Sequence, residues 1–316
     1  MLLGLLLISL ASISWGTTGA TMTLLARDAG MGPFVVGWSR LAIAAPALVG
    51  TAVVAKMLQP RHPAGGAARL GLVVAGLTSR DLGAWLILGL AMAAYQAFYF
   101  WAVTLTGVAV AALLAICSAP LMIAFLAALF LKERVTLVVL VSLGMALAGT
   151  VLLVVGPHAL PQISGHFRLG ALLALGAGLS YAVYAVTAKG LLRRAAPLTV
   201  SAATFTLAAL FLAPLALGAG GGPGTLGAPS PILGGTLPAL YLMLYLGLGP
   251  TAAAYALFTV GLRRVPATAA GIVTLLEPLT ATLLGVFAFG ESLGATGLAG
   301  GGLLLGAIAL LTLVRP

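Results

Sequence analysis

Long apolar stretches recur along the whole chain, and the short breaks between them hold most of the charged residues. A bilayer core about 30 Å thick needs roughly 20 apolar residues in helical form, so each stretch is long enough to span a membrane. Runs such as LVVLVSLGMALAGTVLLVV are apolar on every side, whereas strands of a membrane β-barrel alternate apolar and polar residues. The pattern predicts ten transmembrane helices, at residues 2–25, 33–55, 83–104, 107–130, 135–155, 169–191, 198–218, 237–261, 266–289 and 293–314.

The first apolar stretch, MLLGLLLISLASISWG, also has features of a signal peptide. No Lys or Arg precedes it, however, and the apolar run continues past residue 20. These two features favour a membrane-spanning helix. We therefore count it as helix 1 and number the other predicted helices from it.

Composition and charge support this interpretation. Hydrophobic residues make up 62% of the chain and charged residues only 6%, whereas about a quarter of the residues in soluble domains are charged. The net charge of +10 could suggest a nucleic-acid partner, but topology explains it better. With a cytoplasmic N-terminus, the outer breaks hold Arg27 and Arg168, and the cytoplasmic segments hold Lys56, Arg61, Arg69, Arg80, Lys132, Arg134, Lys189, Arg193, Arg194, Arg263, Arg264 and Arg315. This positive-inside bias predicts a bacterial inner-membrane protein with both termini in the cytoplasm and no nucleic-acid partner.

The chemistry of enzymes and metal sites is poorly represented. Cys117 is the single cysteine, which excludes an intrachain disulfide, and His62, His158 and His166 all fall in predicted loops. An intramembrane enzyme would need a nucleophile and base, paired aspartates or a metal motif, and neither GxSxG nor HExxH occurs. An ion channel would need a filter or rings of charge. We therefore expect no catalytic residues, no metal and no cofactor.

The second half of the chain resembles the first. When AAYQAFYFWAVTLTGVAVAALLAICSAPLMIAFLAALFLKER is placed on TAAAYALFTVGLRRVPATAAGIVTLLEPLTATLLGVFAFGES, Pro120 falls on Pro278 and Glu133 on Glu291. Earlier in the chain, LASISWGTTGATMTLLAR resembles LGAGLSYAVYAVTAKGLLRR. The sequence thus predicts two five-helix repeats, at residues 1–156 and 169–316.

An odd number of helices in each repeat requires the second copy to cross the membrane in the opposite direction. The loop charges obey this requirement, because Lys132 and Arg134 in the first repeat correspond to Gly290 and Ser292 in the second. Inverted repeats are typical of secondary transporters, whose substrate site lies near the middle of the membrane between the two halves. We therefore expect an all-α membrane protein built around a central cavity.

Each repeat also contains a proline-centred helix followed by a short acidic turn, PLMIAFLAALFLKER in the first and EPLTATLLGVFAFGES in the second. In these features the whole chain resembles the EamA family of the drug/metabolite transporter superfamily. The resemblance implies that helices 1, 3, 4, 6, 8 and 9 surround the cavity and that helices 5 and 10 are peripheral. It also implies export of small metabolites by alternating access, with aromatic or neutral amino acids prominent, and multidrug or other metabolite efflux as alternatives.

Glu277 is the only acidic residue predicted to lie deep in the membrane. A carboxylate there costs about 2.5–3.5 kcal/mol on insertion scales, so it should face protein or water and have a partner. One interpretation is a contact with a substrate ammonium or a group that takes up and releases a proton. The other is a structural acid bonded to a neighbouring hydroxyl or to Arg40. Arg40 itself is expected either to extend toward water or to hold a substrate carboxylate.

Two prolines are predicted to bend their helices. Pro278 lacks an N–H and leaves the carbonyl of Thr274 without its helical donor, and Pro120 does the same in helix 4. Gly271 lies about two turns before Pro278, so Gly271, Pro278 and Pro120 are candidate hinges. A static kink that shapes the cavity is the alternative.

Helices 1, 3, 6 and 8 carry the remaining candidates for the cavity wall. The small and polar face of helix 1 is best explained by close packing, with Trp15 beside it as a candidate for substrate contact. A tyrosine at membrane depth needs a partner for its hydroxyl, which favours a cavity position over lipid. Ordinary helix packing remains the alternative for these residues. The candidates are Tyr95, Gln96 and Tyr99 in helix 3, Tyr181 and Tyr184 in helix 6, and Tyr255 in helix 8.

The expected partners are a small-molecule substrate and membrane lipid. A monomer is compatible with the sequence, which leaves the oligomeric state open.

Overall fold

The computed structural model describes residues 1–29, 31–58, 81–154, 166–218, 229–232, 235–289 and 294–313. Glu291, which the repeat pairs with Glu133, lies outside these residues, as do Arg61, Arg69, Arg80 and Arg315 and the histidines at positions 62 and 158. The first repeat comprises α1 (Leu2–Gly16), α2 (Thr18–Ala29), α3 (Pro33–Met57), α5 (Leu82–Thr106), α6 (Val108–Leu126) with the π-helical turn η2 (Ala127–Leu131), and α7 (Leu137–Val154).

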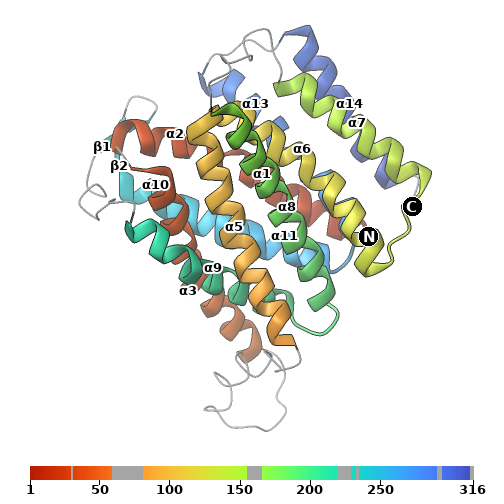
Figure 1. Cartoon of the computed structure of the whole chain (residues 1–316), viewed down its shortest axis with the longest axis horizontal. Helices are drawn as coiled ribbons and strands as arrows, with labels where there is room; N and C mark the ends of the chain where they lie inside the picture. Colours follow the sequence, from red (N-terminus) through yellow and green to blue (C-terminus); the bar gives the residue numbers. More distant parts are fainter. Residues whose placement is uncertain are drawn as a thin grey trace.

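The second repeat comprises α8 (Phe167–Leu191), α9 (Pro197–Gly218), α10 (Ala239–Leu246), the π-helical turn η4 (Gly247–Ala253), α11 (Ala254–Leu262), α12 (Ala267–Val273), α13 (Leu276–Phe289) and α14 (Ala295–Leu313). Between α9 and α10, the strands β1 (Pro229–Ile232) and β2 (Gly235–Pro238) pair in an antiparallel hairpin, which the sequence pattern did not predict. The hairpin lies at the same end of the molecule as α2 (Figure 1).

Each of the ten predicted spans has a helical counterpart. Within the described ranges, nine helices are long and apolar enough to cross a membrane, and the apolar helix at Leu137–Leu153 is shorter. Three predicted spans are not regular α-helices. Helix 1 is interrupted at Thr17, helix 8 contains η4 around Pro250, and helix 9 is interrupted between α12 and α13.

The contacts between helices follow the inverted repeat. In the first half α5 packs against α8, and in the second half the equivalent helix, α11, packs against α1. In the same way α6 packs against α8, and its counterparts α12 and α13 pack against α1. The pairs α3–α9 and α7–α14 join equivalent helices of the two repeats, and α7 and α14 lie side by side at one edge of the molecule (Figure 1). The prediction of an all-α membrane protein with two inverted five-helix repeats is confirmed.

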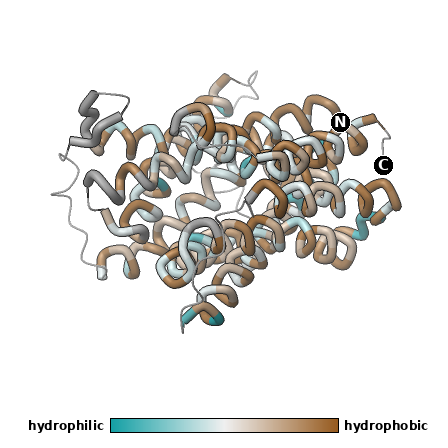
Figure 2. Tube along the Cα trace, turned by 90° about the horizontal axis from the view of Figure 1, so that it is seen from above, coloured by the Kyte–Doolittle hydropathy of each residue, from teal (hydrophilic) through white to brown (hydrophobic). Residues whose placement is uncertain are grey.

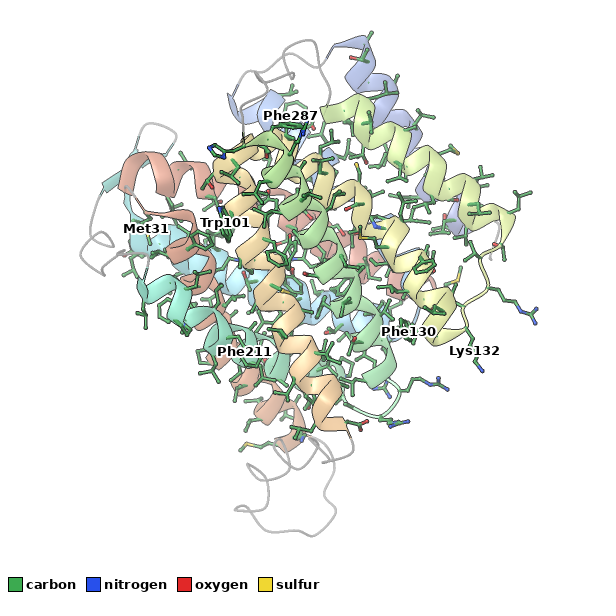
Figure 3. The ribbon with its side chains drawn as sticks, in the orientation of Figure 1. Met31, Trp101, Phe130, Lys132, Phe211 and Phe287 are labelled. Atoms are coloured by element: carbon green, nitrogen blue, oxygen red, sulfur yellow. The ribbon has the colours of Figure 1, made fainter. Side chains whose placement is uncertain are left out.

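The outside of the bundle is apolar, as expected for a surface that faces lipid. Large apolar side chains are exposed on several helices, including Trp101, Phe130, Phe211 and Phe287, which point away from the bundle in Figure 3. Hydrophobic residues cover the tubes of most helices in Figure 2, with hydrophilic residues confined to short segments. A soluble protein would not leave such a surface uncovered, so the bundle is built to lie in a membrane.

Glycines allow the two peripheral helices to approach closely. A Cβ built on Gly149 in α7 would lie 2.6 Å from the carbonyl oxygen of Gly300 in α14, and a Cβ on Gly300 would lie 2.6 Å from the carbonyl oxygen of Gly149. Because these neighbours are backbone atoms, they cannot rotate away. Small residues at such crossings are characteristic of membrane helix pairs.

We expect Gly149→Leu and Gly300→Leu each to lower the free energy of unfolding by about 1–3 kcal/mol, since the helices must separate to admit the side chain. Thermal unfolding in detergent measures the effect. Gly144→Leu in α7 and Gly302→Leu in α14 are matched controls, because a Cβ at either position meets nothing within 4 Å. Equal destabilisation at all four positions would contradict the close crossing.

Candidate functional site

A cavity of about 210 Å³ lies between the two repeats. Helices 1, 3, 4, 6, 8 and 9 contribute to its wall, as the resemblance implied, and helices 2 and 5 add Arg40 and Thr150. Its charged, aromatic and hydroxyl-bearing lining residues are Trp15, Thr18, Arg40, Tyr95, Tyr99, Phe100, Thr150, Tyr181, Tyr255, Thr274, Glu277 and Thr282.

The interruption of helix 1 lies directly after Trp15. The backbone N–H of Thr17 donates to the carbonyl of Ser14 (3.2 Å), and its hydroxyl donates to the same carbonyl (2.8 Å). The Thr17 hydroxyl also hydrogen-bonds to the hydroxyl of Tyr245 in α10 (2.7 Å), which links the interruption to the other repeat. These bonds end α1 at Gly16, and α2 begins at Thr18. The prediction of one continuous helix from residue 2 to residue 25 was therefore wrong.

The interruption of helix 9 lies directly before Glu277. The Thr274 hydroxyl donates to the carbonyl of Gly271 (2.7 Å), and the N–H of Leu275 donates to the carbonyl of Ile272 (3.2 Å). The N–H of Glu277 donates to the carbonyl of Thr274 (3.0 Å), the same carbonyl that Pro278 leaves without a helical donor. A tight turn thus satisfies the backbone, and α13 restarts with Glu277 in its first turn. An acidic residue is favourable there because the helix dipole is positive at its N-terminus.

The two interruptions lie against each other. A Cβ built on Gly16 would lie 2.8 Å from the carbonyl oxygen of Glu277 and 2.5 Å from the Cβ of Thr280. Only a glycine lets the end of α1 approach the first turn of α13 this closely. Pairs of discontinuous helices that meet near the middle of the membrane form the binding sites of many secondary transporters.

Glu277 is half-buried and faces the cavity. Within the described part of the chain, its carboxylate makes no hydrogen bond and no ion pair, since the ion pair found there joins Arg194 to Asp81. The structural interpretation, in which Glu277 is locked to a hydroxyl or to Arg40, is therefore not what the structure contains. The carboxylate is available to a ligand in the cavity.

Arg40 lies on α3 with 6% of its surface exposed. Its guanidinium does not extend to water, so the prediction that the side chain reaches the membrane surface was wrong. The residue lines the same cavity as Glu277, and its charge acts electrostatically on Glu277, Tyr95 and Tyr99. A cation and an anion thus share the cavity without forming an ion pair.

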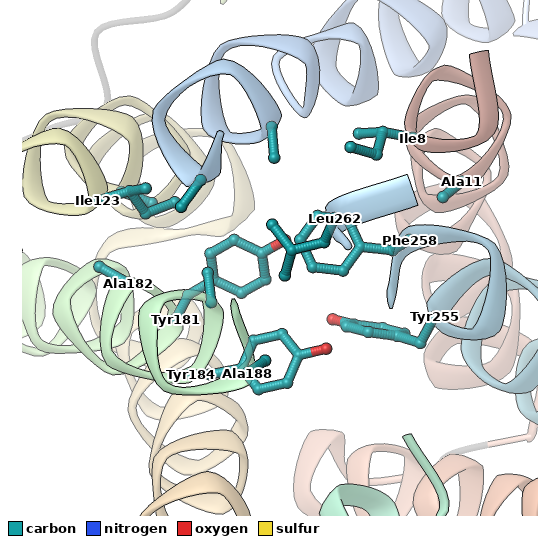
Figure 4. Packing of buried hydrophobic residues seen from close by; sticks show 14 of the residues in the cluster. Ile8, Ala11, Ile123, Tyr181, Ala182, Tyr184, Ala188, Tyr255, Phe258 and Leu262 are labelled. Atoms are coloured by element: carbon teal, nitrogen blue, oxygen red, sulfur yellow. The ribbon is translucent and has the colours of Figure 1, made fainter. Parts of the chain in front are cut away.

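Aromatic rings form a continuous wall beside these charges. The Trp15 ring centroid lies 4.6 Å from that of Tyr255 and 6.4 Å from that of Tyr181, and Tyr95 lies 5.6 Å from Tyr181 and 6.0 Å from Tyr99. All five residues line the cavity. The rings of the cluster that come from α8 and α11 face one another in Figure 4. Trp15 Nε1 and the Tyr181 hydroxyl have no hydrogen-bond partner, so both can donate to a ligand.

Two of the predicted contact residues do not line the cavity. Tyr184 is fully buried in the aromatic cluster, 5.7 Å from Tyr181, and packs on the side away from the cavity. Gln96 is also buried, with its Nε2 unpaired. Adjacent residues on a helix point about 100° apart, so Gln96 cannot share the direction of Tyr95. Both positions contribute to packing in this conformation.

The three hinge candidates lie close together. Gly271 in α12 crosses α6 at Pro120, because a Cβ on Gly271 would lie 3.5 Å from the Pro120 Cα and 3.1 Å from the Ile123 Cδ1. α6 continues through Pro120 without an interruption, whereas helix 9 is interrupted between Gly271 and Pro278. The repeats therefore differ at equivalent positions.

Polar side chains join the two repeats beyond the aromatic cluster, at the opposite end from α2 and the hairpin. Glu133 lies between η2 and α7 and accepts hydrogen bonds from the N–H groups of Ala267 (2.7 Å) and Thr268 (3.2 Å) and from the Thr268 hydroxyl (3.0 Å). Nearby, Lys189 at the end of α8 donates to the carbonyls of Leu262 and Val265, both at 2.7 Å. These bonds hold both ends of the turn between α11 and α12, and sequence reasoning had not assigned Glu133 or Lys189 any such role.

Comparison with known proteins agrees with this architecture. A solved crystal structure superposes with a TM-score of 0.77 at 22% identity, covering 98% of this chain and 96% of that chain, which establishes the fold. The uncharacterized transporter YwfM of Bacillus subtilis (strain 168) is 34% identical over 306 residues, covering 95% of this chain and 90% of YwfM. An uncharacterized transporter of Archaeoglobus fulgidus is 32% identical over 226 residues, covering 71% of this chain and 75% of its own.

The sequence profile of the EamA-like transporter family matches the chain twice, over residues 2–155 and 168–313. The two matches together cover nearly all of the chain, and the similar proteins named above are transporters. The chain therefore belongs to the EamA-like transporter family.

Proposed function

We propose that this transporter exports amino acids with aromatic or neutral side chains from the cytoplasm by alternating access. The observation that carries the proposal is the cavity between the two interrupted helices, where an unpaired carboxylate lies next to an aromatic wall. The Glu277 carboxylate suits a substrate ammonium, and the rings of Trp15, Tyr95 and Tyr99 suit an apolar or aromatic side chain. These are the two groups that such amino acids share.

The size of the cavity supports a small metabolite over a drug. Pockets for drug-sized ligands typically have volumes of about 300–1,000 Å³, and this cavity has about 210 Å³. Its charge argues against sugar phosphates, because one cation, Arg40, and one anion, Glu277, line it. A phosphate would require several cationic side chains.

The direction of opening follows from the polar contacts between the repeats. Glu133 and Lys189 lie at the end of the molecule that the charge pattern places in the cytoplasm, and their bonds close that end beyond the aromatic cluster. We therefore assign the described conformation to a state closed on the cytoplasmic side, in a bacterial inner membrane with both termini cytoplasmic. Release of these bonds would be part of the transition to the opposite state.

Efflux from proteoliposomes tests the proposed function. Vesicles containing the purified protein are loaded with radiolabelled phenylalanine, tryptophan or leucine, or with a sugar phosphate or a cationic dye. We expect efflux of the amino acids above the rate of protein-free vesicles, and no efflux of the sugar phosphate or the dye. Efflux of the dye alone would instead indicate multidrug transport and would contradict the proposal.

Tyr99→Ala is expected to change substrate preference more than expression. Tyr99 lines the cavity beside Tyr95, so its removal takes away apolar surface that an aromatic side chain would contact. The ratio of phenylalanine to alanine efflux should fall by about 3- to 10-fold, since a ring contact contributes about 0.5–1.5 kcal/mol. Tyr241→Ala is the matched control, because Tyr241 is 58% exposed and lies outside the cavity. An equal loss for both substrates would contradict a contact role.

A further inference from the structure

Arg40 is a buried cation in the middle of an apolar helix. Its helix, α3, is long and apolar enough to span the membrane, and only 6% of the residue is exposed. A buried guanidinium loses its hydration, and buried charges in membrane helices are normally paired or face a functional cavity. The residue lines the cavity, so the question is which anion compensates for its burial.

The protein itself supplies no such anion in this conformation. Arg40 Nε is buried and has no hydrogen-bond partner, and no ion pair joins Arg40 to any described residue. Of the acidic side chains described, Asp81 pairs with Arg194 and Glu133 bonds to the start of α12. Glu277 is the one described acid on the cavity wall, and it is not within ion-pair distance of Arg40. The guanidinium is thus held next to an open space without a partner.

We propose that Arg40 binds the carboxylate of the transported substrate, so that the cavity recognises both charged ends of an α-amino acid. The inference rests on the proposed function, in which Glu277 receives the ammonium group. The planar guanidinium has five N–H donors and fits a carboxylate with two parallel hydrogen bonds. A zwitterion brings one negative and one positive group, and it therefore satisfies Arg40 and Glu277 together without adding net charge to the cavity.

This arrangement determines specificity through the groups that a wrong ligand leaves unpaired. An amine without a carboxylate can contact Glu277 but leaves Arg40 buried and unsatisfied. A carboxylic acid without an amine leaves Glu277 in the same condition. Sites built around buried polar groups reject ligands that lack the complementary group far more strongly than apolar pockets reject a change of size. The aromatic wall, by contrast, would accept phenylalanine, phenethylamine and 3-phenylpropionate alike.

The three compounds therefore make the test. Proteoliposomes containing the wild-type protein, Arg40→Met, Arg40→Lys or the control Arg193→Met are loaded with radiolabelled phenylalanine, phenethylamine or 3-phenylpropionate, and initial efflux is measured. Arg193 is an exposed residue outside this cavity, so its substitution removes a charge elsewhere. We expect the wild type and Arg193→Met to prefer phenylalanine over the amine by about 10- to 100-fold. Arg40→Met should lose phenylalanine efflux by a similar factor, and Arg40→Lys should fall between the two.

Thermal unfolding in detergent separates binding from a structural role. Phenylalanine should raise the unfolding temperature of the wild type and not that of Arg40→Met, whereas Arg40→Met without ligand should unfold at the wild-type temperature or higher. An early unfolding of Arg40→Met with an unchanged preference for phenylalanine would show that Arg40 is structural and would overturn the inference.

The wild-type protein alone provides a second test that needs no variant. If it transports phenylalanine and phenethylamine equally, the inference fails and the proposed transport of amino acids stands. If it transports neither phenylalanine nor any other amino acid, the proposed function fails and the inference fails with it.

Discussion

Glu277→Gln is expected to reduce the initial rate of amino-acid efflux by about tenfold or more. The substitution keeps the size of the side chain and one carbonyl oxygen, but it removes the negative charge that we propose to bind the substrate ammonium. A hydrogen bond between charged groups contributes about 1.5–3 kcal/mol, and each 1.4 kcal/mol corresponds to a factor of ten. Efflux of radiolabelled phenylalanine from proteoliposomes, at matched protein content, measures the loss.

Glu277→Asp is the matched control because it keeps the charge and shortens the side chain. It should retain more activity than Glu277→Gln if charge is what matters, and less if the length of the side chain is what matters. Unfolding temperatures of both variants should remain close to that of the wild type, since the carboxylate has no hydrogen-bond partner within the described residues. An unchanged rate in Glu277→Gln would assign the residue to packing.

The positions of the helices could be predicted because each depends on a property that the sequence states directly. Length and hydrophobicity locate a membrane span, as in α5 (Leu82–Thr106) and α8 (Phe167–Leu191), which lie within a few residues of the predicted ranges. The inverted repeat could be predicted because Pro120 and Pro278 mark equivalent points of two similar segments. The hairpin between α9 and α10 could not be predicted, because its residues follow no strand-like alternation of apolar and polar positions.

Interruptions within helices were harder to anticipate than their positions. The turn before Glu277 follows a proline, and the missing N–H gives a local reason for it. The interruption at Thr17 has no such signal. It depends on hydrogen bonds from Thr17 to Ser14 and to Tyr245, and Tyr245 lies more than two hundred residues away in the chain. A contact of this kind is visible only in the folded molecule.

The same distinction separates the correctly placed cavity residues from the others. Tyr95 and Tyr99 are four residues apart and share a helical face, and both line the cavity. Gln96 is their neighbour in sequence but points in another direction, which the spacing alone already argued against. For Arg40 the alternatives of water and cavity depended on whether neighbouring helices cover the side chain. Periodicity along one helix does not contain that information.

Glu133 joins the two repeats through charge-assisted hydrogen bonds. It lies in the first repeat, just after Lys132, whose left-handed backbone (φ 57°) ends η2 and turns the chain toward α12. Its carboxylate oxygens accept the first free N–H groups of α12, at Ala267 and Thr268. These donors belong to the N-terminus of a helix, where an anion is favoured both by unsatisfied N–H groups and by the helix dipole. Because α12 leads through the interruption to Glu277, the contact at the closed end is connected by one short helix to the cavity.

Glu133→Ala should therefore shift the protein toward the state that is open on the proposed cytoplasmic side. Loss of these bonds removes about 2 kcal/mol from the closed state, which corresponds to a change of more than tenfold in the ratio of the two states. Spin labels on cysteines introduced at the exposed positions Arg134 and Arg264, in a Cys117→Ser background, report the separation of the two repeats. The longer distance should gain population in Glu133→Ala. Asp81→Asn, which removes an ion pair to the exposed Arg194, is the control and should leave the distances unchanged, because surface ion pairs contribute little. A distance distribution in Glu133→Ala identical to that of the parent would show that packing of α6 against α12, rather than the carboxylate, keeps this end closed.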